Sequence, residues 1–272
     1  MKQYIFVLFT ISLSVSFSQD SIVYSWEKIR SHSVNEDEVW TVDLLENIYI
    51  SEGEMIHKYD SFGSLKFSQS IKSLGGATCL VPMNAMKLIH FSEEQQTLCY
   101  FDNTLSSMND CVDLSRKNIV SAELVCGSSQ PNKIWVLDNL NSTLHLLSLG
   151  VVQQNQEVGN LQGVLDVANI TQIRERSNTL FVLDKSKGIY VFDLYATLIE
   201  FIPGENIQQL DAYDRTLFTV SKNMLSVRSL VTGEEFSVEL PIDDVDELCY
   251  RNHFFYLRSG GNIHKYRLQL SE

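Results

Sequence analysis

Residues 40–70 read WTVDLLENIYISEGEMIHKYDSFGSLKFSQS and contain four short segments rich in Ile, Val, Leu, Tyr and Trp. These residue types favour β-strands, whereas the interruptions SEGE and DSFGS are typical of turns. The stretch therefore predicts four consecutive antiparallel strands joined by short turns. A helix is not indicated, because the apolar residues do not recur at helical spacing.

The second strand of this unit recurs along the chain. Its six copies begin at Ile48, Leu88, Ile134, Leu180, Leu217 and Phe254. The intervals between copies are 40, 46, 46, 37 and 37 residues, and a third apolar segment follows each copy after eight to ten residues. The tetrapeptide IHKY, at 56–59 and again at 263–266, belongs to this third segment in the first and last units. A period of about 40–45 residues with four strands per repeat is typical of one blade of a β-propeller.

The chain is therefore predicted to be all-β, a six-bladed β-propeller of four-stranded antiparallel blades. The predicted blades cover residues 40–70, 77–114, 119–158, 164–203, 206–241 and 244–270. Segments such as IWVL at 134–137 are apolar on both faces, which suits a sheet packed between two neighbours. Five or seven blades, or an array of two-sheet sandwiches, are the alternatives.

The last unit ends after its third strand, and this would leave an unpaired sheet edge. Residues 21–29, SIVYSWEKI, precede the first blade and have no partner in it. We expect them to form the outer strand of the sixth blade, because closing the ring removes an edge that could pair between molecules.

The stretch 40–70 resembles one blade of the NHL repeat type, and KGIYVFDLYATLIEF at 187–201 is a second, partial match. As an arrangement, residues 21–270 are similar to six-bladed propellers of the NHL and TolB-like kind. The resemblance implies a short central channel with strand-connecting loops at its two ends.

Residues 1–18 have the pattern of a signal peptide. Lys2 supplies the positive charge, Tyr4 to Phe17 form an apolar run, and Ser16-Phe17-Ser18 gives a small-x-small cleavage site before Gln19. A retained N-terminal anchor is the alternative. We expect residues 19–272 to form a single propeller domain in the periplasm or outside the cell, not integral to the membrane once the signal is removed.

The formal charge is −13, and it becomes −14 when Lys2 is removed with the signal. This charge disfavours binding to nucleic acid or to an anionic membrane surface. A monomer that binds a protein partner or a small ligand on a propeller face is expected. Of the five cysteines, Cys99 and Cys111 could form a disulfide in an oxidising compartment. The other three, Cys79, Cys126 and Cys249, lie in apolar segments typical of buried thiols.

No catalytic motif is found in the sequence, and no catalytic or metal-binding residue is assigned. His57, His145 and His264 occupy equivalent positions in three third strands, which could suggest a metal site. Because third strands lie away from the channel, packing roles are the better interpretation.

Propellers of the gluconolactonase and paraoxonase kind imply calcium at the channel mouth as a possible cofactor. Calcium prefers six to eight oxygen ligands. By position the candidates are Glu123, Asp166, Gln172, Asn206, Asp211, Asp243, Asp244 and Asp246. Their spacing singles out no set. The leading hypothesis is thus a non-catalytic protein-interaction or ligand-binding module, and the alternative is a calcium-dependent lactonase or hydrolase.

Overall fold

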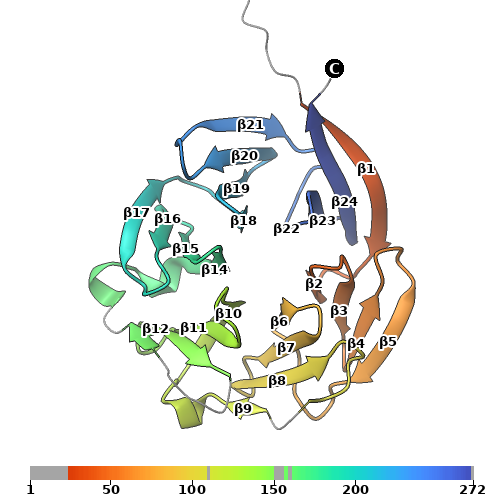
Figure 1. The fold of residues 1–272 in the computed structure, drawn as a ribbon, viewed down its shortest axis with the longest axis vertical. Coiled ribbons are helices and arrows are strands. Elements are labelled where there is room, and N and C mark those ends of the chain that lie inside the picture. The colour runs from red at the N-terminus through yellow and green to blue at the C-terminus, as the bar shows by residue number, and fades with distance from the viewer. Residues whose placement is uncertain (1–23, 109–110, 150–155, 159–160, 271–272) are drawn as a thin grey trace, which may run out of the picture.

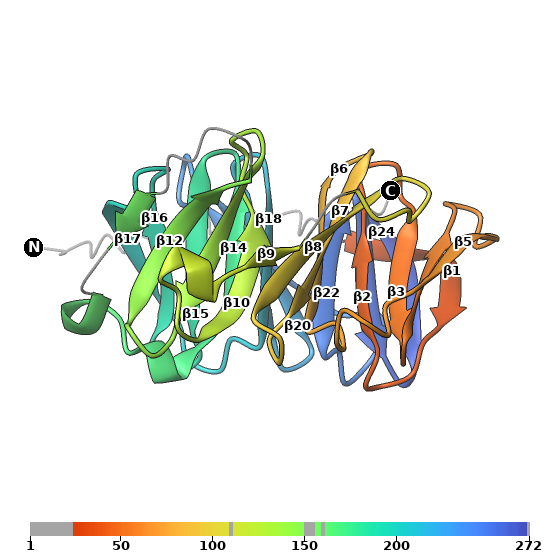
Figure 2. The same ribbon diagram turned by 90° about the horizontal axis from the view of Figure 1, so that it is seen from below.

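The computed structural model describes residues 24–108, 111–149, 156–158 and 161–270, and these form six four-stranded antiparallel sheets around a central axis (Figure 1). Seen from the side, the strands run between the two faces of the ring (Figure 2). The six-bladed propeller predicted from the repeat is confirmed. No helix among these residues is long and apolar enough to cross a membrane.

The four strands of each blade follow one another outward from the central axis. Blade 1 contains β2 (Val39–Val42), β3 (Ile48–Glu52), β4 (Met55–Tyr59) and β5 (Leu65–Ser70). Blade 2 contains β6 (Cys79–Asn84), β7 (Lys87–Ser92), β8 (Thr97–Asp102) and β9 (Val112–Asp113). Blade 3 contains β10 (Ala122–Gly127), β11 (Lys133–Asp138), β12 (Thr143–Ser148) and β13 (Gln156–Val158).

Blade 4 contains β14 (Ile170–Arg176), β15 (Thr179–Asp184), β16 (Gly188–Phe192) and β17 (Leu198–Pro203). Blade 5 contains β18 (Gln209–Tyr213), β19 (Thr216–Ser221), β20 (Met224–Ser229) and β21 (Glu235–Glu239). Blade 6 contains β22 (Glu247–Arg251), β23 (Phe254–Ser259), β24 (Asn262–Leu270) and β1 (Tyr24–Ser33). In the described part of the chain, three short 3-10 helices lie in the connections: η1 (Ser115–Lys117), η2 (Leu161–Gly163) and η3 (Val167–Asn169).

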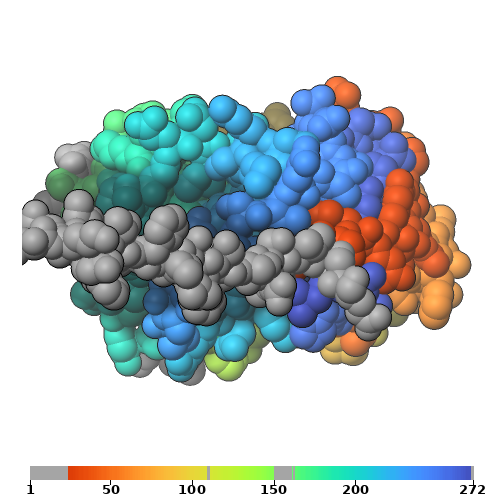
Figure 3. All heavy atoms as spheres, turned by 90° about the horizontal axis from the view of Figure 1, so that it is seen from above, coloured from red at the N-terminus to blue at the C-terminus, as the bar shows by residue number. Residues whose placement is uncertain are grey.

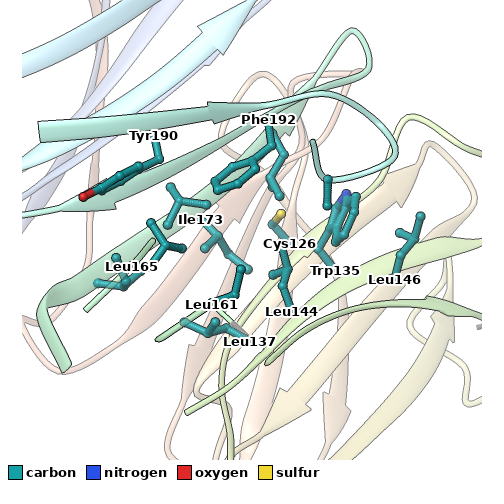
Figure 4. Packing of buried hydrophobic residues seen from close by; sticks show 14 residues of the cluster. Cys126, Trp135, Leu137, Leu144, Leu146, Leu161, Leu165, Ile173, Tyr190 and Phe192 are labelled. Atoms are coloured by element: carbon teal, nitrogen blue, oxygen red, sulfur yellow. The ribbon is translucent and has the colours of Figure 1, made fainter. Parts of the chain in front are cut away.

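Strand β11 shows why the repeated quartets are apolar on both faces. Ile134 and Val136 pack against blade 2, in a cluster with Ile89 and Phe91. The alternate residue Trp135 points to the other side, into a cluster with Ile173 and other residues of blade 4 (Figure 4). Successive side chains of a strand point to opposite faces, so each blade fills the space on both of its sides.

The ring closes where the two ends of the chain meet. Strand β1 pairs antiparallel with β24 from Tyr24 opposite Leu270 to Ser33 opposite Asn262. The space-filling view shows this N-terminal strand, in red, lying against the blue C-terminal strands (Figure 3). The prediction placed this outer strand in the correct blade but ended it too early, because β1 continues past Ile29 to Ser33. Its second half is mostly polar, so hydropathy gave no sign of it, and backbone pairing with β24 holds it in place. Residues 21–23 and the predicted signal 1–18 lie outside the described residues.

Other contacts of blade 6 reinforce the closure. The Trp26 indole Nε1 donates a hydrogen bond to the Glu239 carbonyl oxygen of blade 5 at 2.8 Å. The Tyr24 ring stacks on Phe236, also in blade 5. On the other side, Lys265 forms an ion pair with Glu46, which precedes β3 of blade 1.

One disulfide joins Cys99 of β8 to Cys111, just before β9. It ties the two-residue outer strand of blade 2 to its neighbour. Cys126 and Cys249 are buried free thiols, and Cys79 is half-buried.

Because Trp26 packs at the ring closure, we expect it to contribute strongly to stability. We expect Trp26→Ala to lower the free energy of unfolding by about 2 kcal/mol, through lost packing on Phe255 and Tyr266 and a lost hydrogen bond. Urea unfolding measures this value. The control is Lys28→Ala, an exposed position on the same strand, and equal stability of the two variants would contradict the role assigned to Trp26.

Candidate functional site

The innermost strands of the six blades surround a central cavity of about 470 Å³. Its lining comes from the ends of these strands and from the first residues of the turns that follow them. Polar residues at the strand ends and in these turns form the mouth, among them Asn84, Ser128, Ser129, Ser177, Asp214 and Asn252. The cavity therefore lies toward the face of the ring where each innermost strand turns into the second strand.

Three arginines of blades 4 and 6 converge on one carboxylate of blade 5. Asp211 is completely buried in β18, and its Oδ2 accepts hydrogen bonds from Arg251 Nη1 at 3.1 Å and from the Tyr250 amide at 2.9 Å. Its Oδ1 lies 3.4 Å from both Arg174 Nε and Arg176 Nη2. We refer to Arg174, Arg176, Arg251 and Asp211 as the arginine cluster.

The pKa directions follow from this arrangement. Burial alone would raise the pKa of Asp211, but the three guanidinium groups outweigh it and hold that pKa well below its ordinary value. Burial lowers the pKa of Arg176 to about 10, and the Arg251 guanidinium adds to that effect. Asp211 is thus ionised and Arg176 protonated at neutral pH, and the cluster sets three guanidinium groups against one carboxylate.

Two further carboxylates, Asp43 and Glu175, line the cavity, and each accepts hydrogen bonds from residues outside the arginine cluster. Asp43 accepts hydrogen bonds from the Asn47 side chain at 2.8 Å and from the Tyr49 hydroxyl at 3.0 Å. Glu175 accepts one from Trp135 Nε1 at 2.6 Å and one from the Ser129 amide at 2.8 Å, both in blade 3. Asp43 thus stabilises the turn between β2 and β3, and Glu175 joins blade 4 to blade 3.

The wall formed by blades 2 and 3 is mainly apolar. Val81 and Val125 are buried there, beside the thiols of Cys79 and Cys126. Burial raises the pKa of Cys79 to about 11 and that of Cys126 to about 12, so both thiols are protonated at neutral pH and are weak nucleophiles. The cavity combines a cationic side with an apolar side, which is an arrangement suited to binding.

The structure places one calcium candidate, Asp211, in this cluster, where it pairs with arginines. Most of the others bond to nearby groups: Gln172 to the Leu210 backbone, Glu123 to Asn139, Asp166 to Asn169, and Asp246 to Arg258. Asn206, Asp243 and Asp244 lie in loops before β18 and β22, at the end of these strands away from the cavity mouth. Within the described ranges, no group of three or more His, Cys, Asp or Glu residues could hold a metal ion.

The three aligned histidines lie in the third strands of blades 1, 3 and 6, as the repeat predicts. His57 Nδ1 is 2.8 Å from the Ser68 hydroxyl, and His264 Nδ1 is 2.7 Å from the Ser31 hydroxyl, each serine being on the adjoining outer strand. His145 is buried in β12. The three histidines lie in separate blades and do not form a cluster.

Sequence reasoning missed the three arginines. Their signal was present, because ITQIRER and ELCYR place charged residues in strands expected to line the channel. A charge in an innermost strand needs a partner across the channel or a ligand within it. The partner Asp211 belongs to a different blade and could not be matched to them by spacing.

No protein-family model matches the chain, and no curated protein matches its sequence. Solved structures match its fold. A streptogramin B lyase structure gives a TM-score of 0.63 at 10% identity, covering 91% of this chain and 98% of that one. Virginiamycin B lyase from Staphylococcus aureus gives 0.59 at 11% identity, covering 90% and 99%. BamB from Moraxella catarrhalis gives 0.53 at 10% identity, covering 89% and 98%.

The chain is a six-bladed β-propeller. At these identities the likeness extends to the fold alone, and the similar structures include both lyases and BamB. Fold therefore does not decide function for this propeller, and its function has to be argued from the cavity.

The arginine cluster predicts a specific dependence of stability on pH. We expect Asp211→Asn to lower the free energy of unfolding at neutral pH by about 3 kcal/mol or more, because it leaves the buried Arg251 and the partly buried Arg174 and Arg176 without their counter-charge. The folded-state pKa of Asp211 lies below the ordinary 3.8, so its stabilising contribution is complete above that value and is lost as the pH falls through the folded-state pKa.

The difference in the free energy of unfolding between the wild type and Asp211→Asn should therefore shrink as the pH is lowered below about 4. Urea unfolding at a series of pH values measures it. Asp37→Asn, which removes an exposed carboxylate, is the matched control. A deficit that stays constant down to low pH would show that charge pairing is not its cause.

Proposed function

We propose that this chain is an exported, non-catalytic binding module whose central cavity takes a small molecule. The observation that carries the proposal is the cavity itself, which has a cationic side, an apolar side and a polar mouth. Ligand sites in proteins are typically concave and mostly apolar, with a few polar groups that set orientation. A volume of about 470 Å³ lies within the usual range for such sites.

The groups on the cavity wall favour binding over chemistry. Each thiol is kept protonated by burial, and each buried carboxylate is engaged by donors or by arginines. A general base or nucleophile needs a free lone pair poised near the reacting atom. The arrangement supports a site that holds its ligand unchanged.

Two observations support export. The pattern of residues 1–18 is that of a signal peptide, and the Cys99–Cys111 disulfide fits an oxidising compartment such as the periplasm or the cell exterior. Protein partners on either face of the ring are compatible with the same module, and the cavity gives the more specific hypothesis.

Export predicts a defined N-terminus. We expect the protein expressed with residues 1–272 to be recovered from the periplasmic or culture fraction beginning at Gln19. Intact mass spectrometry checks both this cleavage and the mass of the oxidised cysteine pair. Replacing Lys2 to Phe17 by an unrelated polar sequence is the control and should leave the protein in the cytoplasm. A full-length protein in the cytoplasmic fraction would contradict export.

Ligand binding in the cavity predicts sensitivity to a bulky residue at its mouth. A thermal-shift screen with a library of small molecules should find compounds that raise the Tm. A ligand present at a hundred times its Kd stabilises the folded state by about 2.7 kcal/mol. We expect Ser128→Trp, which fills the mouth, to abolish these shifts.

The matched control is Ser73→Trp, an exposed position in the loop between β5 and β6, at the end of the innermost strands away from the mouth. This variant should keep every shift. Compounds that stabilise Ser128→Trp as well as the wild type would place their binding outside the cavity and contradict the proposal.

A further inference from the structure

The geometry points to a small organic anion as the ligand of the central cavity, with its carboxylate or phosphate group bound by Arg174 and Arg176 and its apolar part against the wall of blades 2 and 3. This inference rests on the proposed function of the cavity and adds the chemical class of the ligand. Four features of the described residues support it.

The first feature is a surplus of hydrogen-bond donors. A guanidinium group carries five N–H donors and no acceptor. Arg174 donates no hydrogen bond to another described residue, and Arg176 donates only one, from Nη1 to the Glu175 carbonyl oxygen. The buried Nε of Arg174 and Nη2 of Arg176 lie within ion-pair distance of Asp211 Oδ1 but make no hydrogen bond. Among the described residues, their only anionic neighbour within ion-pair distance is Asp211, at 3.4 Å. Donors left over in a buried cation are costly unless an acceptor reaches them.

The second feature is the local balance of charge. The arginine cluster holds three cations and one carboxylate, and the Asp211 oxygens are already shared with the amides of Tyr250 and Ala212. The other buried acids of the lining, Asp43 and Glu175, are bound by donors outside the cluster. Burial lowers the pKa of Arg176, and the neighbouring Arg251 guanidinium lowers it further, against the opposing effect of Asp211.

The third feature is the depth at which the arginines lie. Arg176 and Arg251 are the last residues of β14 and β22, next to the turns that form the mouth, and Arg174 is two residues deeper in β14. Both Arg174 and Arg176 keep about a quarter of their side-chain surface exposed (25% each), whereas Arg251 keeps 8%. Arg251 holds Asp211 and the Val42 carbonyl, so Arg174 and Arg176 are the two that can receive a ligand.

The fourth feature is the apolar wall. Val81, Met83 and Val125 line the cavity on blades 2 and 3. Carboxylate and phosphate groups match the planar fork of a guanidinium group, and an aliphatic body would contact the valines. A free inorganic ion would satisfy the donors but would make no contact with this wall.

Isothermal titration calorimetry at constant ionic strength tests the inference with three probes: succinate, its neutral analogue succinamide, and inorganic phosphate. We expect succinate to bind the wild-type protein and to bind Arg174→Gln and Arg176→Gln about tenfold or more weakly, because each variant loses a charged hydrogen-bond donor. Succinamide should bind more weakly than succinate. Phosphate that binds more tightly than succinate would identify a phosphate-bearing ligand within the same class.

Arg116→Gln removes the same charge from the exposed helix η1 and should bind succinate like the wild type. Thermal unfolding of each variant checks its folding, and Arg176→Gln at the strand end serves if Arg174→Gln does not fold. Equal binding of succinate by wild type and both cavity variants would overturn the inference, as would no binding of either anion up to about 10 mM.

The remaining outcomes separate this inference from the proposed function. If succinamide binds as tightly as succinate and Ser128→Trp abolishes both, the cavity is a binding site for neutral molecules, and only the anion is wrong. If succinate binds equally to the wild type and to Ser128→Trp, it binds elsewhere on the protein, and both proposals fail.

Discussion

The structure depends on the burial of both faces of each blade. A four-stranded sheet whose second strand reads IWVL or LFVL cannot leave either face in water without losing the stabilisation that apolar burial provides, about 25 cal/mol per Å². Two stacked sheets would cover one face each, and only a ring covers all of them. The same requirement explains why the alternation along β11 sends Ile134 toward one neighbour and Trp135 toward the other.

In such a ring, one edge of every sheet lies near a common axis. The innermost strands at this edge make polar contacts in place of apolar packing. Here the innermost strands exchange side-chain and backbone hydrogen bonds between blades, as in Asp211 with the Tyr250 amide and Arg251 with the Val42 carbonyl. Asp211 thus both joins blade 5 to blade 6 and balances part of the charge of the cavity. The fold and the candidate site share this residue.

Much of the fold could be predicted from the sequence, because each blade repeats the same short-range pattern. The second and third strands begin close to the expected positions, and the two IHKY copies are indeed the third strands β4 and β24. Strand β1 was harder to delimit, since Arg30 to Ser33 carry no apolar signal and are held by pairing with a strand over 200 residues away. The arginine cluster could not be predicted, because Arg174, Asp211 and Arg251 belong to three blades, and their convergence depends on the curvature of the ring.

The pairing of β1 with β24 has a consequence for how the molecule is made. The Ser31 hydroxyl meets His264 across a sequence separation of 233 residues, so the first strand to leave the ribosome must wait for the last one before it has a partner. Folding that requires such distant contacts is slow, because the entropy of closing the whole chain is lost before the contacts form. Blades 1 to 5 are each built from consecutive strands, so closure of the ring by β1 and β24 is the step that depends on the most distant contacts.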